Sequence, residues 1–298
     1  MVIAHMSGGF GNQLYSFAFG YSLAKNRGEE FWIDTAIQDA SWFFRNPDIL
    51  KLNIEYDKRI TYKIGRTIPD RAVFNKLRFR KAIGWRTKKI MEKDIASEQE
   101  WFSYCKSQKG NIYVQGNWSM ESLFLPVKSD ILRMYTFREP LKGEAEKLAD
   151  EIQSISNTVG VHYRRGDYVN IGISMKPSYY RNAMDKMAAM IKEPVFYCFS
   201  EDLDWVKEQF KDYPYDIRYP KYESDDKGID DFRLLSLCNH QITANSSYSW
   251  WAAYLNKNDN KEIICPCDWD GGWSLAMYPE EWIKLPFEKY PKEPILVR

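Results

Sequence analysis

Apolar positions near the N-terminus follow first the period of a strand and then that of a helix. The apolar run Val2–Met6 predicts a short strand, and a glycine-rich stretch follows it. Large apolar residues then recur at helical spacing, at Leu14, Phe17, Ala18 and Tyr21. Gly28 suits the end of this helix, and Phe31–Asp34 predicts the next strand. The chain therefore opens with the strand–helix–strand order of a doubly wound domain.

The second half of the chain alternates more regularly between strand and helix patterns. From residue 158 onward, apolar runs of strand length and amphipathic stretches of helix length follow each other. We expect strands over 159–163, 195–199, 240–244 and 262–265. We expect helices over 178–191, 203–210, 230–238 and 247–255. This order predicts a parallel sheet with helices on both faces.

The region between these two parts is less regular. Residues 36–110 hold short apolar pieces among many lysines and arginines, 112–115 indicates another strand, and 141–154 a polar helix. We place the domain boundary after residue 154. The chain is then an α/β protein of two Rossmann-like domains, residues 1–154 and 155–298, which we expect to face each other across a cleft.

Charge and composition narrow the class of partner. The 298 residues include 42 Lys and Arg against 41 Asp and Glu, and this balance argues against nucleic acid as a bulk partner. Aromatic residues make up 16% of the chain, which leaves rings available to line a sugar pocket. No apolar run approaches the length of a membrane span, so we expect a cytoplasmic protein.

Cysteines and histidines do not indicate a zinc site. The chain has five cysteines, an odd number without a paired C-x-x-C pattern, and three histidines. Cys198 and Cys238 lie in apolar segments and are predicted to be buried thiols. Cys265-Pro266-Cys267 fits the end of a strand better than a redox pair.

A basic segment over residues 71–93 allows two interpretations. It carries nine Lys and Arg and a single acid, Glu92, with apolar residues interspersed. It is either an amphipathic segment that contacts anionic lipid at the inner membrane face, or a helix that packs on its domain with its charges in water. The second interpretation is favoured because the apolar positions keep no clean helical phase.

The stretch Val161–Tyr168 carries the strongest candidate chemistry. Arg164 and Arg165 appear where a buried strand gives way to a loop, and ligands of open α/β sheets bind at that edge. Arginine offers a fixed fork of N–H donors that suits phosphate oxygens. The alternative is a surface loop in which the arginines pair with Asp167 and other acids.

Two other segments have the composition of anion sites. Gly8-Gly9-Phe10-Gly11 lets the backbone approach a ligand and opens a helix, and Asn12 and Gln13 add amide donors that a purely structural turn does not need. Asn245-Ser246-Ser247 follows a strand and opens another helix, so it fits a phosphate without a metal. Each segment taken alone also fits an ordinary turn or helix cap.

Together these segments resemble glycosyltransferase family 11, the α-1,2-fucosyltransferases. The resemblance rests on blocks that occur in the family's order between residue 7 and about residue 256. The blocks are Gly8–Gln13, His162–Tyr168, Phe199–Asp202 with Trp205–Lys207, and Asp231-Phe232 through Asn245–Trp251. The departures are Phe10 for the usual leucine, Glu201 for the common aspartate and Ala252 for the usual glycine. Residues 36–110 cannot be aligned, and we expect them to govern acceptor choice.

The resemblance implies a GT-B fold, GDP-β-L-fucose as donor and transfer with inversion to the 2-hydroxyl of a terminal β-galactoside. No cofactor and no metal would be required. The acceptor would be a galactoside-terminated oligosaccharide or a lipid-linked glycan of the cell surface. Related enzymes with other regiochemistry, such as α-1,6 transfer, and a non-catalytic nucleotide-sugar- or glycan-binding protein are the alternatives.

The resemblance also assigns roles to residues of the three segments. Arg164 would bind the donor phosphates, His162 and Asp231 the guanine, and Ser246 and Ser247 the β-phosphate. Asn12 would lie where the first domain meets the sugar and the leaving group. The remaining donor-binding candidates are Gly9, Gly11, Arg165 and Asn245. Asp231 alternatively is a helix N-terminal carboxylate that balances the helix dipole.

The general base stays open at this stage. Asp167 is the candidate nearest in sequence to Arg164, but it equally fits a role in pairing with the arginines. His5 and Glu201 are weaker candidates. If the leaving group departs early, a strong base is not required.

Overall fold

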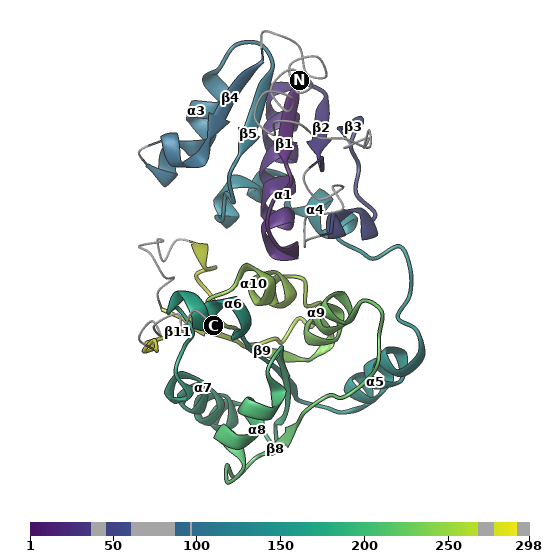
Figure 1. Cartoon of the computed structure of the whole chain (residues 1–298), viewed down its shortest axis with the longest axis vertical. Helices are drawn as coiled ribbons and strands as arrows, with labels where there is room; N and C mark the ends of the chain where they lie inside the picture. The colour runs from purple at the N-terminus through teal and green to yellow at the C-terminus, as the bar shows by residue number, and fades with distance from the viewer. Residues whose placement is uncertain (37–45, 61–86, 96, 268–276, 291–298) are drawn as a thin grey trace, which may run out of the picture. The chain divides into compact units, whose positions relative to one another are not determined.

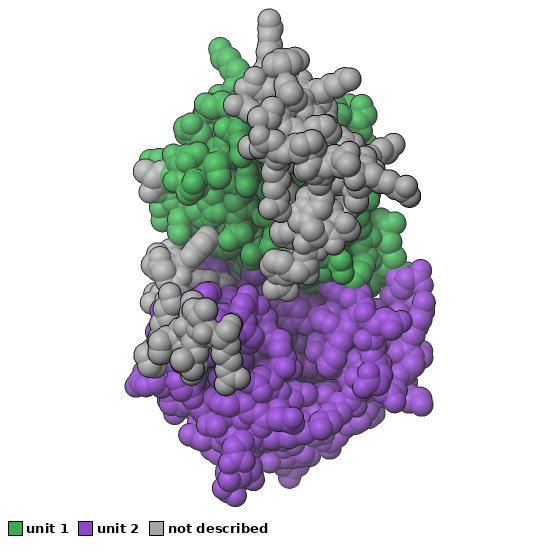
Figure 2. All heavy atoms as spheres, in the orientation of Figure 1, with its two compact units in different colours: residues 1–138 green, residues 139–298 purple. Residues whose placement is uncertain are grey.

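The computed structural model describes residues 1–36, 46–60, 87–95, 97–267 and 277–290. The chain divides into two compact units, Met1–Arg138 and Glu139–Arg298, coloured separately in Figure 2. This boundary lies earlier than the expected one after residue 154. The helix over 143–154 belongs to the second unit because Glu151 accepts hydrogen bonds from Tyr197 and Arg218 of that unit.

The first unit is built on a five-stranded sheet with the order β3-β2-β1-β5-β4, in which every ladder is parallel (Figure 1). Its strands are β1 (Val2–His5), β2 (Phe31–Asp34), β3 (Lys58–Ile60), β4 (Lys88–Met91) and β5 (Ile112–Gln115). Its described α-helices are α1 (Phe10–Arg27), α3 (Trp101–Ser107) and α4 (Lys128–Met134). Short 3-10 turns lie at Asp48–Lys51, Glu92–Asp94, Glu98–Glu100, Glu121–Leu123 and Leu125–Val127.

Helix α1 has the ends that the glycines predict. Gly9, in extended conformation, precedes the helix, and Gly28 ends it in the left-handed region with φ of 63°. The N–H of Gly28 bonds to the carbonyls of Ala24 and Lys25, which satisfies the last turn. The helix starts at Phe10, so the glycine loop is shorter than the sequence pattern suggests.

The second unit contains a six-stranded parallel sheet with the order β11-β10-β9-β6-β7-β8. Its strands are β6 (Thr158–Tyr163), β7 (Val195–Ser200), β8 (Asp216–Arg218), β9 (His240–Ile242), β10 (Ile263–Pro266) and β11 (Ile283–Leu285). Its described helices are α5 (Gly143–Ser154), α6 (Gly166–Ile171), α7 (Pro177–Met190), α8 (Leu203–Phe210), α9 (Lys227–Leu237) and α10 (Ser247–Tyr254).

Helices cover both faces of this second sheet, as expected (Figure 1). Val159 and Val161 of β6 pack in one cluster with residues of α7 and α8, among them Met184 and Val206. Between them Gly160 faces the other way, toward Leu235 of α9. The predicted parallel α/β architecture of this half is therefore confirmed, with helix and strand ends shifted by a few residues.

The basic segment over 71–93 is described only from residue 87 onward. Lys88 and Lys89 lie in β4, next to β5, so this part is a strand and not a helix. The rest of the segment, and with it the lipid-contact interpretation, lies outside the described residues. Among the residues that the structure describes, no helix combines the length and apolar character needed to cross a bilayer.

Gly160→Ala tests the contact that positions β6 under α9. A Cβ at this position would lie 2.6 Å from Leu235 Cδ1 and 3.1 Å from the Leu235 carbonyl oxygen, so backbone has to move. We expect the free energy of unfolding to fall by about 1–3 kcal/mol, as measured by urea denaturation. Gly228→Ala is the control in the same unit, because its Cβ meets no atom within 4 Å. Equal stability of the two variants would contradict this packing argument.

Candidate functional site

The residues predicted to bind the nucleotide-sugar donor lie at the carboxyl ends of three neighbouring strands in the second unit. Strand β6 leads into Arg164 and Arg165, β7 into Glu201 and Asp202, and β9 into the segment before α10. Because β9, β6 and β7 are adjacent in a parallel sheet, these segments emerge side by side at one edge. The fold thus brings together blocks that are up to about 80 residues apart in sequence.

Arg164 is held by two carboxylates at this edge. Its Nη2 lies 2.5 Å from Asp167 Oδ1, and its Nη1 donates a hydrogen bond to Glu201 Oε1. Its side chain is only 20% exposed, and its guanidinium carbon lies 5.0 Å from the centre of the Tyr168 ring. The expected alternative role of Asp167, pairing with the arginine, is therefore what the structure contains.

Arg165 is engaged differently from Arg164. Its Nε donates to Asp202 Oδ2 at 3.0 Å, and its guanidinium carbon lies 3.7 Å from the centre of the Trp205 ring. Asp202 also caps α8 by accepting from the N–H of Trp205. Arg165 thus fastens the loop after β6 to the start of α8, and its predicted role toward the donor stays a prediction.

Helix α10 begins at the same edge with polar groups around its first turn. Asn245 donates to the Ile173 carbonyl at 3.0 Å, while its Oδ1 is buried without a hydrogen-bond partner. Ser246 is the N-cap residue and is 4% exposed. Burial raises the pKa of Tyr168, and a hydrogen bond with the Ser246 side chain acts in the opposite direction. The N–H groups of a first helical turn have no carbonyl partner within the helix, so they suit an anion.

His162 is neutral and buried beside this helix. Burial lowers its pKa to about 3, and the positive charge of Arg164 acts in the same direction. Its Nδ1 is buried without a hydrogen-bond partner, and its ring lies 5.0 Å from that of Tyr248 in α10. A neutral imidazole of this kind can donate or accept one hydrogen bond toward a nucleobase.

Asp231 lies on α9, close to the same aromatic residues. The Tyr222 hydroxyl donates to its Oδ1 at 2.6 Å and Lys227 Nζ lies 3.2 Å away. Burial raises the pKa of Asp231. It is the fifth residue of α9, beyond the first turn in which the helix dipole acts, so the dipole explanation is weaker than the sequence suggested. The Phe232 and Tyr248 rings, 5.2 Å apart, connect α9 to α10.

The first unit contains the glycine loop and its predicted residues. Gly8 has φ of +68°, and a Cβ there would lie 2.7 Å from Asn12 Nδ2, so this position suits glycine. Gly9 precedes the helix and Gly11 is buried in its first turn. Asn12 is half-buried, and its N–H bonds to the Gly9 carbonyl.

The amide of Gln13 has a structural role. Its Nε2 donates to the carbonyls of Gly8 and Asn46, and its Oε1 accepts from the N–H of Ile49. These bonds fasten the loop to residues 46–49. The expectation that Gln13 offers a donor beyond the needs of the turn is therefore wrong.

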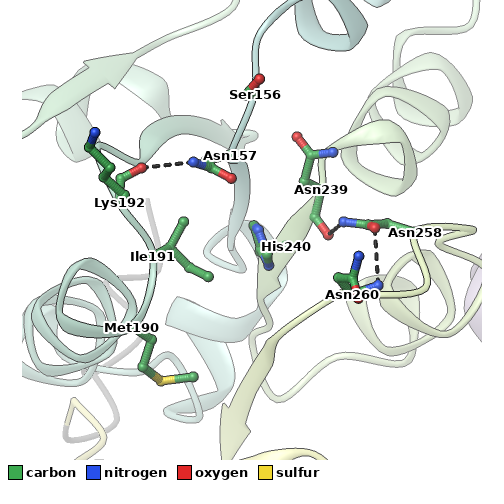
Figure 3. Close-up of a pocket in the computed structure, with 9 residues that line it drawn as sticks. All are labelled: Ser156, Asn157, Met190, Ile191, Lys192, Asn239, His240, Asn258 and Asn260. Atoms are coloured by element: carbon green, nitrogen blue, oxygen red, sulfur yellow. Dashed lines mark hydrogen bonds between the residues drawn. The ribbon is translucent and has the colours of Figure 1, made fainter.

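A surface pocket of about 540 Å³ lies at the opposite, amino edge of the second sheet (Figure 3). Asparagines dominate its wall, and their amides stabilise turns. Asn157 donates to the Lys192 carbonyl, Asn258 donates to the Asn239 carbonyl, and the Asn260 N–H donates to Asn258 Oδ1. None of the residues predicted to bind the nucleotide sugar lines this pocket, so it is not the predicted nucleotide-sugar site.

Metal-ligating side chains are scattered. Within the described ranges, no three His, Cys, Asp or Glu residues cluster as a metal site. All five cysteines are unpaired thiols, and Cys198 and Cys238 are buried as predicted. Cys265 is the third residue of β10, which agrees with the strand-end interpretation of the Cys265–Cys267 stretch.

Residues 78–286 match the family model described as glycosyl transferase family 11. The chain belongs to this family. The resemblance inferred from the sequence blocks is thereby confirmed, and the chain is a glycosyltransferase. The site at the carboxyl edge of the second sheet lies within the matched residues.

Two relatives of this family 11 glycosyltransferase show the range of similarity. It is 28% identical over 298 residues to an α-1,2-colitosyltransferase from Escherichia coli, covering 96% of this chain and 99% of the relative. It is 30% identical over 151 residues to galactoside α-(1,2)-fucosyltransferase 1 from Homo sapiens, covering 46% of this chain and 41% of the human enzyme.

Among solved structures, the family 11 chain is similar to NodZ α-1,6-fucosyltransferase in a crystal soaked with GDP-fucose. The TM-score is 0.51 at 17% identity, covering 86% of this chain and 91% of the other. A structure of NodZ from Bradyrhizobium gives the same TM-score. This likeness concerns the fold, and with two parallel Rossmann-like units it confirms the GT-B class.

Three tyrosines of the family 11 site had no predicted role. Tyr168 lies against Arg164, Tyr248 against His162, and Tyr222 bonds to Asp231. The first two stand inside blocks that the sequence analysis singled out, so their position was the available signal. Tyr222 lies outside every block, and no local pattern marks it.

The neutral state of His162 predicts a pH dependence of stability. An unfolded histidine takes up a proton below about pH 6.5, whereas folded His162 stays neutral down to about pH 3. Stability is therefore lost as pH falls through this range, by about 1.4 kcal/mol per pH unit from this residue. We expect His162→Phe to show a shallower loss of unfolding free energy between pH 6.5 and 4.5.

Tyr248→Phe is the control for this experiment. It keeps the ring against His162 but removes the hydroxyl that bonds to the Gly228 carbonyl. Its pH slope should equal that of the wild type. Identical slopes for His162→Phe and the wild type would mean that His162 is protonated in the folded chain.

Proposed function

We propose that this chain transfers L-fucose from GDP-β-L-fucose to the 2-hydroxyl of a terminal β-galactoside, with inversion and without a metal. The observation that carries the proposal is the Arg164 guanidinium, fixed beside the start of α10 at the carboxyl edge of the second sheet. The family assignment supports glycosyl transfer, and the relative from Homo sapiens supports fucose and α-1,2 linkage.

The proposed reaction places negative charge on the departing β-phosphate. A fork of guanidinium donors and the N–H groups of a helix start can neutralise that charge without a cation. Arg164 and the Asn245–Ser247 segment supply these donors. Asp167 and Glu201 fix the guanidinium in advance, and a diphosphate would replace part of their contact with it.

Guanine recognition is proposed at His162 and Asp231. A carboxylate accepts two neighbouring N–H donors at once, which guanine offers and adenine does not. Asp231 is partly buried, and the ring of Tyr248 lies between α9 and His162 and offers an aromatic surface beside the base. Gly9, Gly11 and Asn12 of the first unit are proposed on the side of the sugar and the acceptor.

One observation supports a second candidate for the sugar-nucleotide substrate. The colitosyltransferase relative aligns along almost the whole chain, whereas the human fucosyltransferase aligns over less than half of it. Colitose is fucose without its 3-hydroxyl, so the two donors differ by a single hydrogen-bonding group. We therefore propose GDP-colitose as the alternative substrate of the same site.

The acceptor is proposed to be a galactoside-terminated oligosaccharide or a lipid-linked glycan at the inner membrane face. The similarity to NodZ does not support the α-1,6 alternative, because it is a similarity of fold. A non-catalytic binding protein is no longer an alternative, because the chain belongs to a glycosyltransferase family.

One incubation tests the proposed reaction. Purified protein is mixed with GDP-fucose or GDP-colitose and a panel of galactosides in excess EDTA, and the product is analysed by mass spectrometry and NMR. We expect a fucosylated product with an α-1,2 linkage and undiminished activity in EDTA. Activity that disappears in EDTA and returns with Mg²⁺ would overturn the metal-free mechanism, and a product with another linkage would overturn the regiochemistry.

Arg164→Ala tests the residue on which the proposal depends. Removing a donor from the developing negative charge typically costs a factor of about 10²–10³ in kcat, and we expect at least this loss. Arg181→Ala is the matched control, because Arg181 lies on α7 and bonds to the Gln209 carbonyl. Thermal unfolding should show both variants folded. Near-normal transfer by Arg164→Ala would contradict the phosphate role.

A further inference from the structure

The Tyr222 hydroxyl is bonded to the carboxylate that is proposed to recognise guanine. Tyr222 lies between β8 and α9, is 8% exposed, and donates its hydroxyl proton to Asp231 Oδ1 at 2.6 Å. The Asp231 side chain is itself only 16% exposed, and burial raises its pKa. A carboxylate in such a position costs free energy unless donors reach it, so the bond from Tyr222 offsets part of that cost.

Two donors share one oxygen of Asp231. Lys227 Nζ lies 3.2 Å from Oδ1, the same atom that accepts from Tyr222. Among the residues that the structure describes, no side chain or backbone N–H donates to Oδ2. A carboxylate offers about four lone-pair sites, two on each oxygen. Asp231 therefore has one oxygen whose sites are filled by the protein and one that can accept from a ligand.

The backbone next to Tyr222 is fixed by bonds that do not involve Asp231. The N–H of Glu223 donates to Glu144 Oε2 of α5 at 2.9 Å, and the Ser224 hydroxyl donates to Asp230 Oδ2 of α9 at 2.6 Å. A side chain orients another group well only when its own position is held. These two bonds supply that support, so the Tyr222 hydroxyl can fix the direction in which the carboxylate points.

Asp231 lies close to the other residues of the proposed nucleotide site. The Tyr248 ring is 5.0 Å from the His162 ring and 5.2 Å from the ring of Phe232, the neighbour of Asp231 on α9. Burial raises the pKa of Tyr248 well above its usual value, the charge of Asp231 acts in the same direction, and that of Arg164 acts in the opposite one. All five residues belong to the second unit, so the argument needs no group from the first.

Guanine would add a third donor to an oxygen that has two. Its N1–H and 2-amino group are neighbours, so one would reach each oxygen of Asp231, and Oδ1 would then have to release Tyr222 or Lys227. Lys227 is the more easily released, because its side chain is 41% exposed and an accessible ion pair contributes little. Its Nζ also lies 3.9 Å from the centre of the Tyr222 ring, a contact that it can keep. The nearly buried Tyr222 hydroxyl has no other partner among the described residues, so its bond is the costlier one to break.

We propose that Tyr222 is a positioning residue for guanine selectivity: its hydroxyl keeps the Asp231 carboxylate directed at the base, while Lys227 leaves Oδ1 when the nucleotide binds. The inference rests on the proposed function, in which Asp231 binds guanine. Oδ2 accepts one N–H of the base, and Oδ1 accepts the other beside the Tyr222 hydroxyl. A base without the 2-amino group leaves one of these oxygens without its donor, and the site selects against it for that reason.

Tyr222→Phe tests the proposal, because it removes the hydroxyl and keeps the ring. The probes are GDP and inosine diphosphate, whose base lacks the 2-amino group, and the dissociation constants are measured by calorimetry. The wild type should prefer GDP by about tenfold or more, the effect of one hydrogen bond to a charged group. In the variant we expect GDP affinity to fall by about tenfold and the preference to approach one. The KM for the donor should rise with little change in kcat, because the lost binding is common to the ground state and the transition state.

Tyr215→Phe is the matched control, since Tyr215 donates in the same way to a carboxylate, Asp185 Oδ1 at 2.9 Å. Its affinities for both nucleotides should equal those of the wild type. Lys227→Met should keep the wild-type preference for GDP, because the lysine leaves Oδ1 in the bound state. A preference lost in Lys227→Met would overturn the proposal even if Tyr222→Phe folds poorly. Thermal unfolding shows which variants are folded.

Asp231→Asn separates this inference from the proposed function. If this variant keeps the wild-type affinity and preference for GDP, Asp231 does not bind guanine, and the proposed guanine site falls together with the inference. If Asp231→Asn loses the preference but Tyr222→Phe retains it, the inference alone is overturned. A wild type that prefers GDP but transfers no sugar would overturn the proposed reaction, while a lost preference in Tyr222→Phe would still support the inference.

Discussion

The Arg164 side chain is only 20% exposed, so its positive charge needs nearby negative charge, and the carboxyl edge of the second sheet supplies it. Arg164 follows β6, and the acids that neutralise it come from the next turn of the chain and from the end of β7. The polar start of α10 joins them through the contact of Tyr168 with Ser246. The parallel order β9-β6-β7 is what places these groups at one edge.

Most helices and strands of the second unit could be predicted from the sequence, because the spacing of apolar residues follows which positions of a helix or strand are buried. Strand β6 is buried at every position, and α7 presents one apolar face to the sheet. The end of α1 was also predictable, because Gly28 adopts the left-handed conformation that glycine favours at a helix end. The short strands at the edges of the sheets could not be predicted. Strands β3 and β8 have three residues each and are largely accessible, so they leave no period to detect.

Contacts between segments that lie far apart in the sequence could not be predicted. The boundary was misplaced because the apolar face of α5 shows that the helix packs, but not on which sheet. The local blocks identified Arg164 and the start of α10, whereas the stacking of Arg165 on Trp205 and the bonds of Gln13 to residues 46–49 depend on the folded chain. The contact of His5 with Tyr113 spans 108 residues and has no local signature.

Both sheets grow outward from the first strand of their unit. β1 is central in its sheet, with β2 and β3 on one side and β5 and β4 on the other. During synthesis β2 and β3 follow soon after β1, but its other edge has no partner until Ile112–Gln115 has been made. An uncovered strand edge presents N–H and C=O groups that recruit foreign strands. The growing polypeptide therefore carries this open edge of β1 while the intervening segment is translated, and in that interval a chaperone could shield it from foreign strands.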